Sequence, residues 1–121
     1  MVIKKILIVD DSPTERLVLT ELLKSNGYRV IAAESGEQAI RLSKLQLPDL
    51  ILMDVVMPGI NGYEATRAIL REDATRHIPI IMCTSRGQPT DKIWGMRQGA
   101  HDYMVKPLDS AALLAKIAAL A

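Results

Sequence analysis

The sequence lacks the features of a nucleic-acid-binding protein. It has no phenylalanine, and aromatic residues make up only 3% of the chain. Its 15 basic residues are scattered and are balanced by 14 acidic ones, which leaves a net charge of +1. A nucleic-acid-binding domain needs a clustered basic face or aromatic side chains on which bases stack. We therefore expect no nucleic-acid partner.

Cysteine and long hydrophobic runs are also scarce. Cys83 is the single cysteine, so no internal disulfide can form, and its apolar surroundings predict a small buried side chain. Near the N-terminus, only four apolar residues separate Lys5 from Asp10. This stretch is too short for the hydrophobic region of a signal peptide or for a membrane span. We expect a cytoplasmic protein without membrane insertion.

The length and composition predict one globular domain. The chain has 121 residues, of which 49% are hydrophobic and 24% charged. A chain of this size buries roughly two-thirds of the surface that it exposes when unfolded. The last predicted helix finishes with the chain, so we expect a single domain over residues 1–121 with no second domain attached.

Short apolar runs alternate with longer segments of helical period, a pattern typical of a parallel sheet built from βα units. We expect strands at residues 3–9, 28–33, 50–53, 79–84 and 102–105. The third and fourth are apolar almost throughout, as interior strands are, whereas the second contains Arg29 and suits an edge. Right-handed crossovers then favour an α/β fold, a flavodoxin-like doubly wound (βα)5 parallel sheet of strand order 2-1-3-4-5.

Helix starts are marked by capping sequences. Residues 12–15, Ser-Pro-Thr-Glu, have the pattern of a capping box with proline at the first helical position. Ser35 begins a similar pattern, and Gly27 suits a left-handed helix end. We expect five helices: from Ser12 to Gly27, from Ser35 to before Pro48, over 62–72, over 90–98 up to Gly99, and from Asp109 or Ser110 onward.

Four of the apolar runs end on residues that can handle a phosphoryl group. The runs lead into Asp10-Asp11, Asp54, Thr84-Ser85 and Lys106-Pro107. Each signal alone is weak, because aspartate is common before helices and in turns. The carboxyl ends of parallel strands, however, meet at one edge of the sheet. The sequence therefore predicts that these complementary side chains form one pocket.

The three carboxylates of Asp10, Asp11 and Asp54 cannot all stay ionised and unpaired in one pocket, because like charges at ~4 Å repel by several kcal/mol. Either the pKa of one of them rises or a cation lies among them. Hard oxygen ligands favour Mg²⁺, with Mn²⁺ as an alternative, and no histidine or cysteine lies beside them to suggest zinc. Asp54 ends the central strand and is placed for in-line attack on phosphorus. Thr84 can hydrogen-bond a phosphoryl oxygen, and Lys106 can pair with another. The Lys106–Pro107 bond is a candidate cis peptide.

Together these motifs resemble the receiver domain of two-component response regulators, over essentially the whole chain. The resemblance rests on residues 8–12 (Ile-Val-Asp-Asp-Ser), 52–59 (Leu-Met-Asp-Val-Val-Met-Pro-Gly), 84–85 (Thr-Ser), 99–103 (Gly-Ala-His-Asp-Tyr) and 106–107 (Lys-Pro). It implies that Asp54 accepts a phosphoryl group from a histidine kinase, and that Lys106 contacts that group. Further implied roles are Mg²⁺ binding by Asp10, by Asp11 directly and by the backbone carbonyl of Val56, and a switch pair of Thr84 and Tyr103.

A finer similarity concerns residues 91–100, which resemble stand-alone chemotaxis-like regulators of type IV pilus, or twitching, motility systems. Such a regulator has no output domain and acts by binding a downstream protein. We expect the face of the fourth helix, fifth strand and fifth helix to be read, including Lys92, Arg97, Gln98 and Tyr103. Trp94 is expected to pack its helix on the sheet, with a place on this face as the alternative. His77 and His101 are expected at the surface.

Three other functions compete with this interpretation. A metal-dependent phosphohydrolase would place a second carboxylate two residues after the nucleophile, where Val56 stands. A scaffold that is never phosphorylated would typically lack one of the site residues, all of which are present. A flavin-binding protein would want hydroxyls and amides where the first loop has Asp10, Asp11 and Ser12. We therefore expect a phosphoacceptor and not a multiple-turnover enzyme, while the sequence leaves the cognate kinase and the downstream target open.

Overall fold

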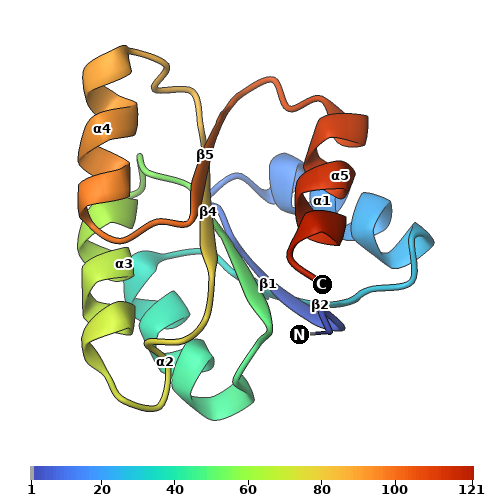
Figure 1. Ribbon diagram of the computed structural model, residues 1–121, viewed down its shortest axis with the longest axis horizontal. Helices are drawn as coiled ribbons and strands as arrows, with labels where there is room; N and C mark the ends of the chain where they lie inside the picture. Colours follow the sequence, from blue (N-terminus) through green and yellow to red (C-terminus); the bar gives the residue numbers. More distant parts are fainter. Residues whose placement is uncertain (1) are drawn as a thin grey trace.

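The structure, a computed structural model, describes residues 2–121 as strands that alternate with helices (Figure 1). The elements are β1 (Lys5–Val9), α1 (Pro13–Ser25), β2 (Arg29–Ala33), α2 (Gly36–Gln46), β3 (Leu50–Met53), α3 (Gly62–Arg71), β4 (Ile80–Thr84), α4 (Pro89–Arg97), β5 (Asp102–Val105) and α5 (Ser110–Ala119). The strands form one parallel sheet of order β2-β1-β3-β4-β5. The predicted fold and strand order are confirmed, and the predicted bounds differ by at most two residues at strand ends.

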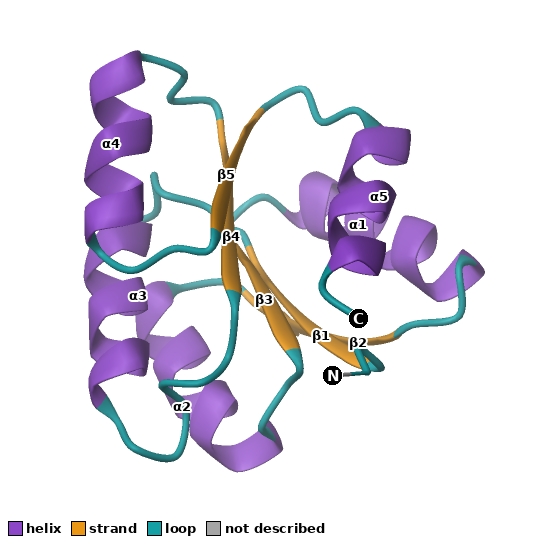
Figure 2. Cartoon of the chain, in the orientation of Figure 1, coloured by secondary structure: helices purple, strands orange, loops and turns teal. Residues whose placement is uncertain are grey.

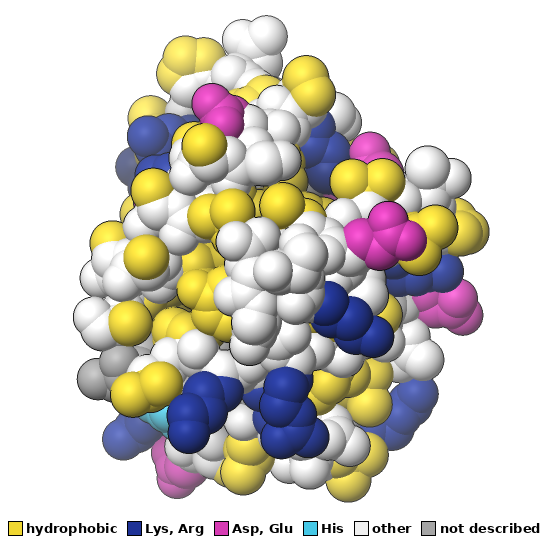
Figure 3. Space-filling model, turned by 90° about the vertical axis from the view of Figure 1, so that its right-hand side faces the viewer, with side chains coloured by type: hydrophobic (Ala, Val, Ile, Leu, Met, Phe, Trp, Pro, Cys, Tyr) yellow, Lys and Arg dark blue, Asp and Glu magenta, His cyan; other side chains and the backbone are white. Residues whose placement is uncertain are grey.

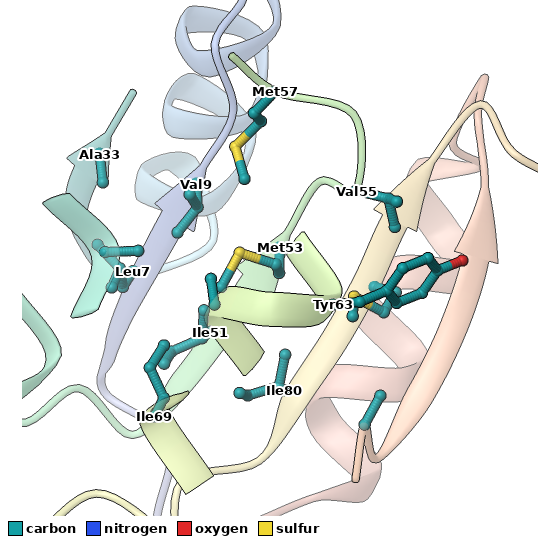
Figure 4. Packing of buried hydrophobic residues seen from close by; sticks show 14 of the residues in the cluster. Leu7, Val9, Ala33, Ile51, Met53, Val55, Met57, Tyr63, Ile69 and Ile80 are labelled. Carbon is teal, nitrogen blue, oxygen red and sulfur yellow. The ribbon is translucent and has the colours of Figure 1, made fainter. Parts of the chain in front are cut away.

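Helices cover both faces of the sheet: α1 and α5 lie on one side, and α2, α3 and α4 on the other (Figure 2). Successive strand residues point to opposite faces and so enter two separate cores. In β1, Leu7 and Val9 pack with residues of α2 and α3 (Figure 4), whereas Ile6 and Ile8 pack with residues of α1 and α5. Because β3 and β4 are buried on both faces, they are apolar throughout, as predicted.

The predicted helix starts are correct, but two of the capping boxes form only in part. Ser12 accepts a hydrogen bond from the Glu15 amide at 3.3 Å, while the Glu15 carboxylate turns to Lys106 and does not cap the helix. At α2, Ser35 accepts from the Gln38 amide, and the Gln38 side chain accepts from the preceding residue, Glu34. The Glu15 side chain therefore pairs with a charged residue across the site and does not complete the capping box of α1.

Most of the predicted burial is confirmed, with Trp94 as the exception. Cys83 is buried, and burial raises the pKa of its thiol to about 12. His77 and His101 are exposed, as expected. Trp94, expected to pack on the sheet, is instead 48% exposed. The inward position on α4 belongs to the buried Gly95, which lies against aromatic rings and leaves no room there for an indole.

Two further structural facts bear on the predictions. Gly27 has a φ of +90° and Gly99 a φ of +104°, the left-handed conformations expected just after α1 and α4. Within residues 2–121, every helix is too short or too polar to span a bilayer.

The start of α3 packs directly under the end of β3. The Gly62 amide donates to the Val55 carbonyl at 2.8 Å, and a Cβ on Gly62 would lie 2.0 Å from the Asp54 carbonyl oxygen. Such an approach is far inside van der Waals contact, so only glycine fits. The close approach holds the segment that follows Asp54 against the helix.

We predict that Gly62→Ala lowers the free energy of unfolding by about 3 kcal/mol, because the new methyl group meets backbone atoms that cannot move independently. Urea unfolding followed by circular dichroism measures the change. Gly87→Ala is the matched control, since the atoms nearest to its Cβ belong to the Val105 side chain, from 3.0 Å, and not to the backbone. Equal stability of the two variants would contradict the prediction.

Candidate functional site

Two buried aspartates lie side by side at the carboxyl edge of the sheet. Val9 of β1 pairs with Met53 of β3, so the next residues, Asp10 and Asp54, leave adjacent strands at the same level. The Asp54 amide donates to the Val9 carbonyl at 2.9 Å and extends this pairing by one residue. Asp10 is 2% exposed and Asp54 8% exposed. The residues that follow the first and third strands therefore lie together, as predicted.

Lys106 follows β5 and brings a positive charge to these carboxylates. Its amide donates to the Thr84 carbonyl at 2.8 Å, which places it just past the end of β5. Its ammonium nitrogen, Nζ, lies 2.7 Å from Asp10 Oδ2 and 3.5 Å from Asp54 Oδ2, and it also pairs with Glu15. The Lys106–Pro107 peptide is cis, as the sequence suggested.

The electrostatics of the site follow from burial and from these pairs. Burial raises the pKa of Asp54, the ammonium of Lys106 lowers it, and the charge on Asp10 raises it, with a net shift upward. Burial alone would lower the pKa of Lys106, but its hydrogen bonds to Asp10 and Glu15 raise it well above the ordinary value. Lys106 is therefore charged at neutral pH and offsets the repulsion between the carboxylates.

The two oxygens of Asp54 have different environments. Oδ1 accepts a hydrogen bond from the Val55 amide at 2.8 Å, whereas Oδ2 has only the 3.5 Å contact with Lys106. Asp10 is held more firmly, with Oδ1 bonded to the Ser12 amide at 2.9 Å and Oδ2 bonded to Lys106 at 2.7 Å. Asp54 Oδ2 is therefore the better placed oxygen to act as a nucleophile.

The acidic residues of the site can hold a divalent cation, although the group differs from the predicted one. One carboxylate oxygen each from Asp10, Glu15 and Asp54 lies within 4.8 Å of the others, and an oxygen-only set suits Mg²⁺. Asp11 is exposed and lies outside this group, so its direct role remains a prediction, as does that of the Val56 carbonyl. The Val56 side chain is 55% exposed.

Glu15 is the site residue that the sequence did not reveal. It occupies the first turn of α1, directly after the loop that carries Asp10, so its side chain can reach the same edge of the sheet. The position of Glu15, one turn after the Asp10 loop, could have indicated its role in the site. The capping-box pattern, however, already gave a local explanation for this glutamate.

The predicted switch residues, Thr84 and Tyr103, are joined through Arg86. Thr84 is fully buried, and its hydroxyl accepts a hydrogen bond from the Arg86 amide at 3.3 Å. Tyr103 is 6% exposed, and its phenol donates to the Arg86 carbonyl at 2.6 Å. Burial and the neighbouring Tyr63 raise the pKa of Tyr103, which stays protonated and able to donate. The structure thus shows the inward position of the aromatic ring.

The other predicted partner-surface residues are more accessible. Lys92 and Arg97 are exposed and Gln98 is half-buried, whereas the buried Tyr103 offers little surface in this conformation. Exposed apolar side chains accompany them, and Trp94 is one of these, in the alternative place that its sequence position had left open. Those exposed on α4 and β5 are Ile93, Trp94, Met96 and Val105.

A groove adjoins the site on the face formed by α1 and α5, which is the face turned toward the viewer in Figure 3. It lies between α1 and the segment from Lys106 to Ser110, and both Glu15 and Lys106 contribute to its wall. Its other lining includes Val18, Leu19 and Leu22 of α1, and Leu17 and Val18 of this helix are more than half exposed. An apolar surface therefore borders the charged cluster.

Comparison with known proteins agrees with this geometry. The model of the response regulator receiver domain family matches residues 6–118. Protein PilH of Pseudomonas aeruginosa is 49% identical over 116 residues, which is 96% of each chain. Several transcriptional regulators match at about 41% identity, and the chain spans about half of their length.

Solved structures share the fold closely. The chemotaxis protein CheY4 of Vibrio cholerae superimposes with a TM-score of 0.92 at 31% identity, covering 99% of this chain and all of that one. The receiver domain of the sensor histidine kinase PA1611 from Pseudomonas aeruginosa, with a magnesium ion coordinated in its active site cleft, gives a TM-score of 0.88 at 36% identity over 96% and 95% of the two chains. The chain therefore belongs to the response regulator receiver domain family of two-component signal transduction.

Proposed function

We propose that this protein accepts a phosphoryl group from a histidine kinase on Asp54, with Mg²⁺ bound, and that phosphorylation changes its binding to a downstream protein. Receiver domains take phosphate from histidine kinases and act on downstream targets. The observation that carries the proposal is the buried Asp54 carboxylate, whose Oδ2 faces the Lys106 ammonium beside Asp10. This is the arrangement that phosphoryl transfer to a carboxylate requires.

The proposed step is an in-line displacement. Asp54 Oδ2 attacks the phosphorus of the phosphohistidine, a P–O bond forms as the P–N bond breaks, and the leaving imidazole nitrogen keeps the electron pair and takes up a proton. Lys106 pairs with a phosphoryl oxygen and so offsets the charge that the group brings. The exposed apolar surface of α1 and the groove beside Lys106 give a phosphodonor protein a place to dock.

The carboxylates fit the metal that the proposal requires. Asp10 and Asp54 would hold Mg²⁺, with Asp11 and the Val56 carbonyl as the further ligands predicted from the family, and Glu15 lies close enough to join or assist them. When bound, Mg²⁺ supplies positive charge that neutralises the carboxylates and the incoming phosphoryl oxygens. Lys106 contacts Asp10 Oδ2 and Asp54 Oδ2, so it would give up part of these contacts where the cation bound the same oxygens.

Phosphorylation is proposed to be read on the face of α4, β5 and α5. The phosphoryl group adds a charge of about −1.5 to −2 and draws the Thr84 hydroxyl toward it. That shift breaks the bond from the Arg86 amide, and Arg86 also holds the Tyr103 phenol. Trp94, Ile93 and Lys92, which are already exposed, offer the partner an apolar surface with a basic rim.

The similarity to PilH supports a role in chemotaxis-like signalling of type IV pilus motility, in the cytoplasm. The protein would act stoichiometrically, since Val56 stands where a phosphohydrolase would carry its second carboxylate. Loss of the phosphoryl group by slow hydrolysis would reset it. We therefore propose a signalling phosphoacceptor and not a multiple-turnover enzyme.

We predict that Asp54→Asn abolishes phosphorylation by acetyl phosphate in the presence of Mg²⁺, because an amide oxygen is too weak a nucleophile. Intact-mass spectrometry would show a gain of one phosphoryl group in the wild type and none in the variant. Asp73→Asn, at an exposed aspartate outside the site, is the control. Equal phosphorylation of Asp54→Asn and wild type would reject the proposed function.

We predict that Glu15→Gln raises the rate of phosphorylation by acetyl phosphate about threefold to tenfold at saturating Mg²⁺. The substitution removes a negative charge close to Asp54 and frees Lys106 for the phosphoryl group, an effect of about 1 kcal/mol because water screens the half-exposed Glu15.

The same substitution is expected to weaken Mg²⁺ binding, measured by isothermal titration calorimetry. Glu21→Gln, an exposed position on the same helix, is the control. A rate and a Mg²⁺ affinity that both match the control would show that Glu15 has no electrostatic part in the site.

A further inference from the structure

The ring of Tyr103 lies against residues of three different elements. Its phenol donates to the Arg86 carbonyl in the loop between β4 and α4, and its oxygen lies 3.4 Å from the phenol oxygen of Tyr63 on α3. The backbone of Gly95 on α4 lies against the ring itself. Tyr63 is also buried, at 4% exposure, and lies at the end of its core cluster next to β4 and β5 (Figure 4).

Tyr63 connects this ring to the first turn of α4. Its phenol donates to the Asp91 carbonyl at 3.1 Å, and the Asp91 carboxylate pairs with the Arg86 guanidinium at 2.9 Å. The two phenols therefore bind the backbone carbonyls of Arg86 and Asp91, the same two residues whose side chains form an ion pair. Because the Arg86 amide also binds the Thr84 hydroxyl, this set of bonds begins at the phosphorylation site and ends on α3.

Gly95 provides the space that the ring needs. A Cβ at this position would lie 2.9 Å from Cδ2 and 3.0 Å from Cε2 of Tyr103, and 3.3 Å from Cε1 of Tyr63. These are atoms of packed rings and not the ends of flexible chains. Any side chain on Gly95 would therefore compete with the buried position of Tyr103.

We propose that Tyr63 is a positioning residue for Tyr103: its phenol, together with the bare backbone of Gly95, forms the seat that the Tyr103 ring occupies when buried. The inference rests on the proposed function, in which Tyr103 alternates between a buried and an exposed position. It assigns part of that balance to Tyr63 on α3 and to Gly95 on the inner face of α4, which are both buried.

The test follows the Tyr103 ring directly in protein that has not been phosphorylated. The chain has three tyrosines, so labelling with 3-fluorotyrosine gives three fluorine resonances that single Tyr→Phe variants assign. Relaxation of the Tyr103 resonance by a soluble gadolinium complex reports how often the ring is exposed. A purely structural contribution to stability would leave this quantity unchanged.

Tyr63→Phe removes the hydrogen bond from the Tyr63 phenol to the Asp91 carbonyl, which holds the first turn of α4 next to the Tyr103 ring. It is expected to raise the exposed fraction of Tyr103 about threefold to tenfold, the factor that corresponds to one modest hydrogen bond. Gly95→Ala is expected to raise it by more than tenfold, although alanine favours a helix more than glycine does. Tyr28→Phe removes the same hydroxyl from a half-buried tyrosine on the opposite face of the sheet, and it serves as the matched control.

The proposal is overturned if Tyr103 relaxes in Tyr63→Phe as it does in Tyr28→Phe. Circular dichroism confirms that each variant is folded, and if Gly95→Ala does not fold, Tyr63→Phe decides alone. Phosphorylation of Asp54 is measured separately by mass. If the protein gains no phosphoryl group, the proposed function is rejected. If it is phosphorylated but the exposed fraction of Tyr103 does not change in Tyr63→Phe, only the positioning role of Tyr63 is rejected.

Discussion

The contact of the Lys106 ammonium with the carboxylates of Asp10, Glu15 and Asp54 is the interaction on which the site depends. At an effective dielectric constant near 20, two carboxylates ~4 Å apart repel each other by about 4 kcal/mol. Asp10 and Asp54 are buried, so water cannot relieve that repulsion, and a cation has to do so. Lys106 supplies the charge from a position 52 residues after Asp54. The same balance prepares the site for a phosphoryl group, whose negative oxygens need the same positive partner.

The parallel sheet makes this contact possible. Its strands are joined by helices that return the chain to the same starting edge, so every strand ends at the opposite edge, where Asp10, Asp54, Thr84 and Lys106 follow β1, β3, β4 and β5. The interior strands are buried on both faces and cannot shift without exposing both cores. The close packing of Gly62 under Asp54 adds a local support. A rigid frame thus holds the charged side chains, while the loops that carry them remain able to respond.

Arg86 gives the site a physical connection to the α4 surface. Its amide binds the Thr84 hydroxyl, its carbonyl binds Tyr103, and its guanidinium binds Asp91 at the start of α4. A movement of Thr84 therefore acts on a residue that already contacts the buried tyrosine and the neighbouring helix. The burial of Tyr103 and the exposure of Trp94 have one cause, since Gly95 takes the inward position on α4 and leaves room only for the tyrosine ring.

The sequence by itself determined the strands, most helix ends and the residues at the strand ends, because apolar periodicity and capping residues depend on neighbours within a few positions. It also determined the strand order, because right-handed crossovers are the general rule for βαβ units. Only the tertiary structure decided which partners these residues take. Glu15 fits a local capping box, yet it pairs with Lys106, 91 residues away, because a partly buried ammonium is a stronger partner than its own helix start. Trp94 matches a packing residue in sequence, yet the space beneath α4 is filled by Tyr103. Such choices depend on distances between elements remote in the chain, which no local pattern contains.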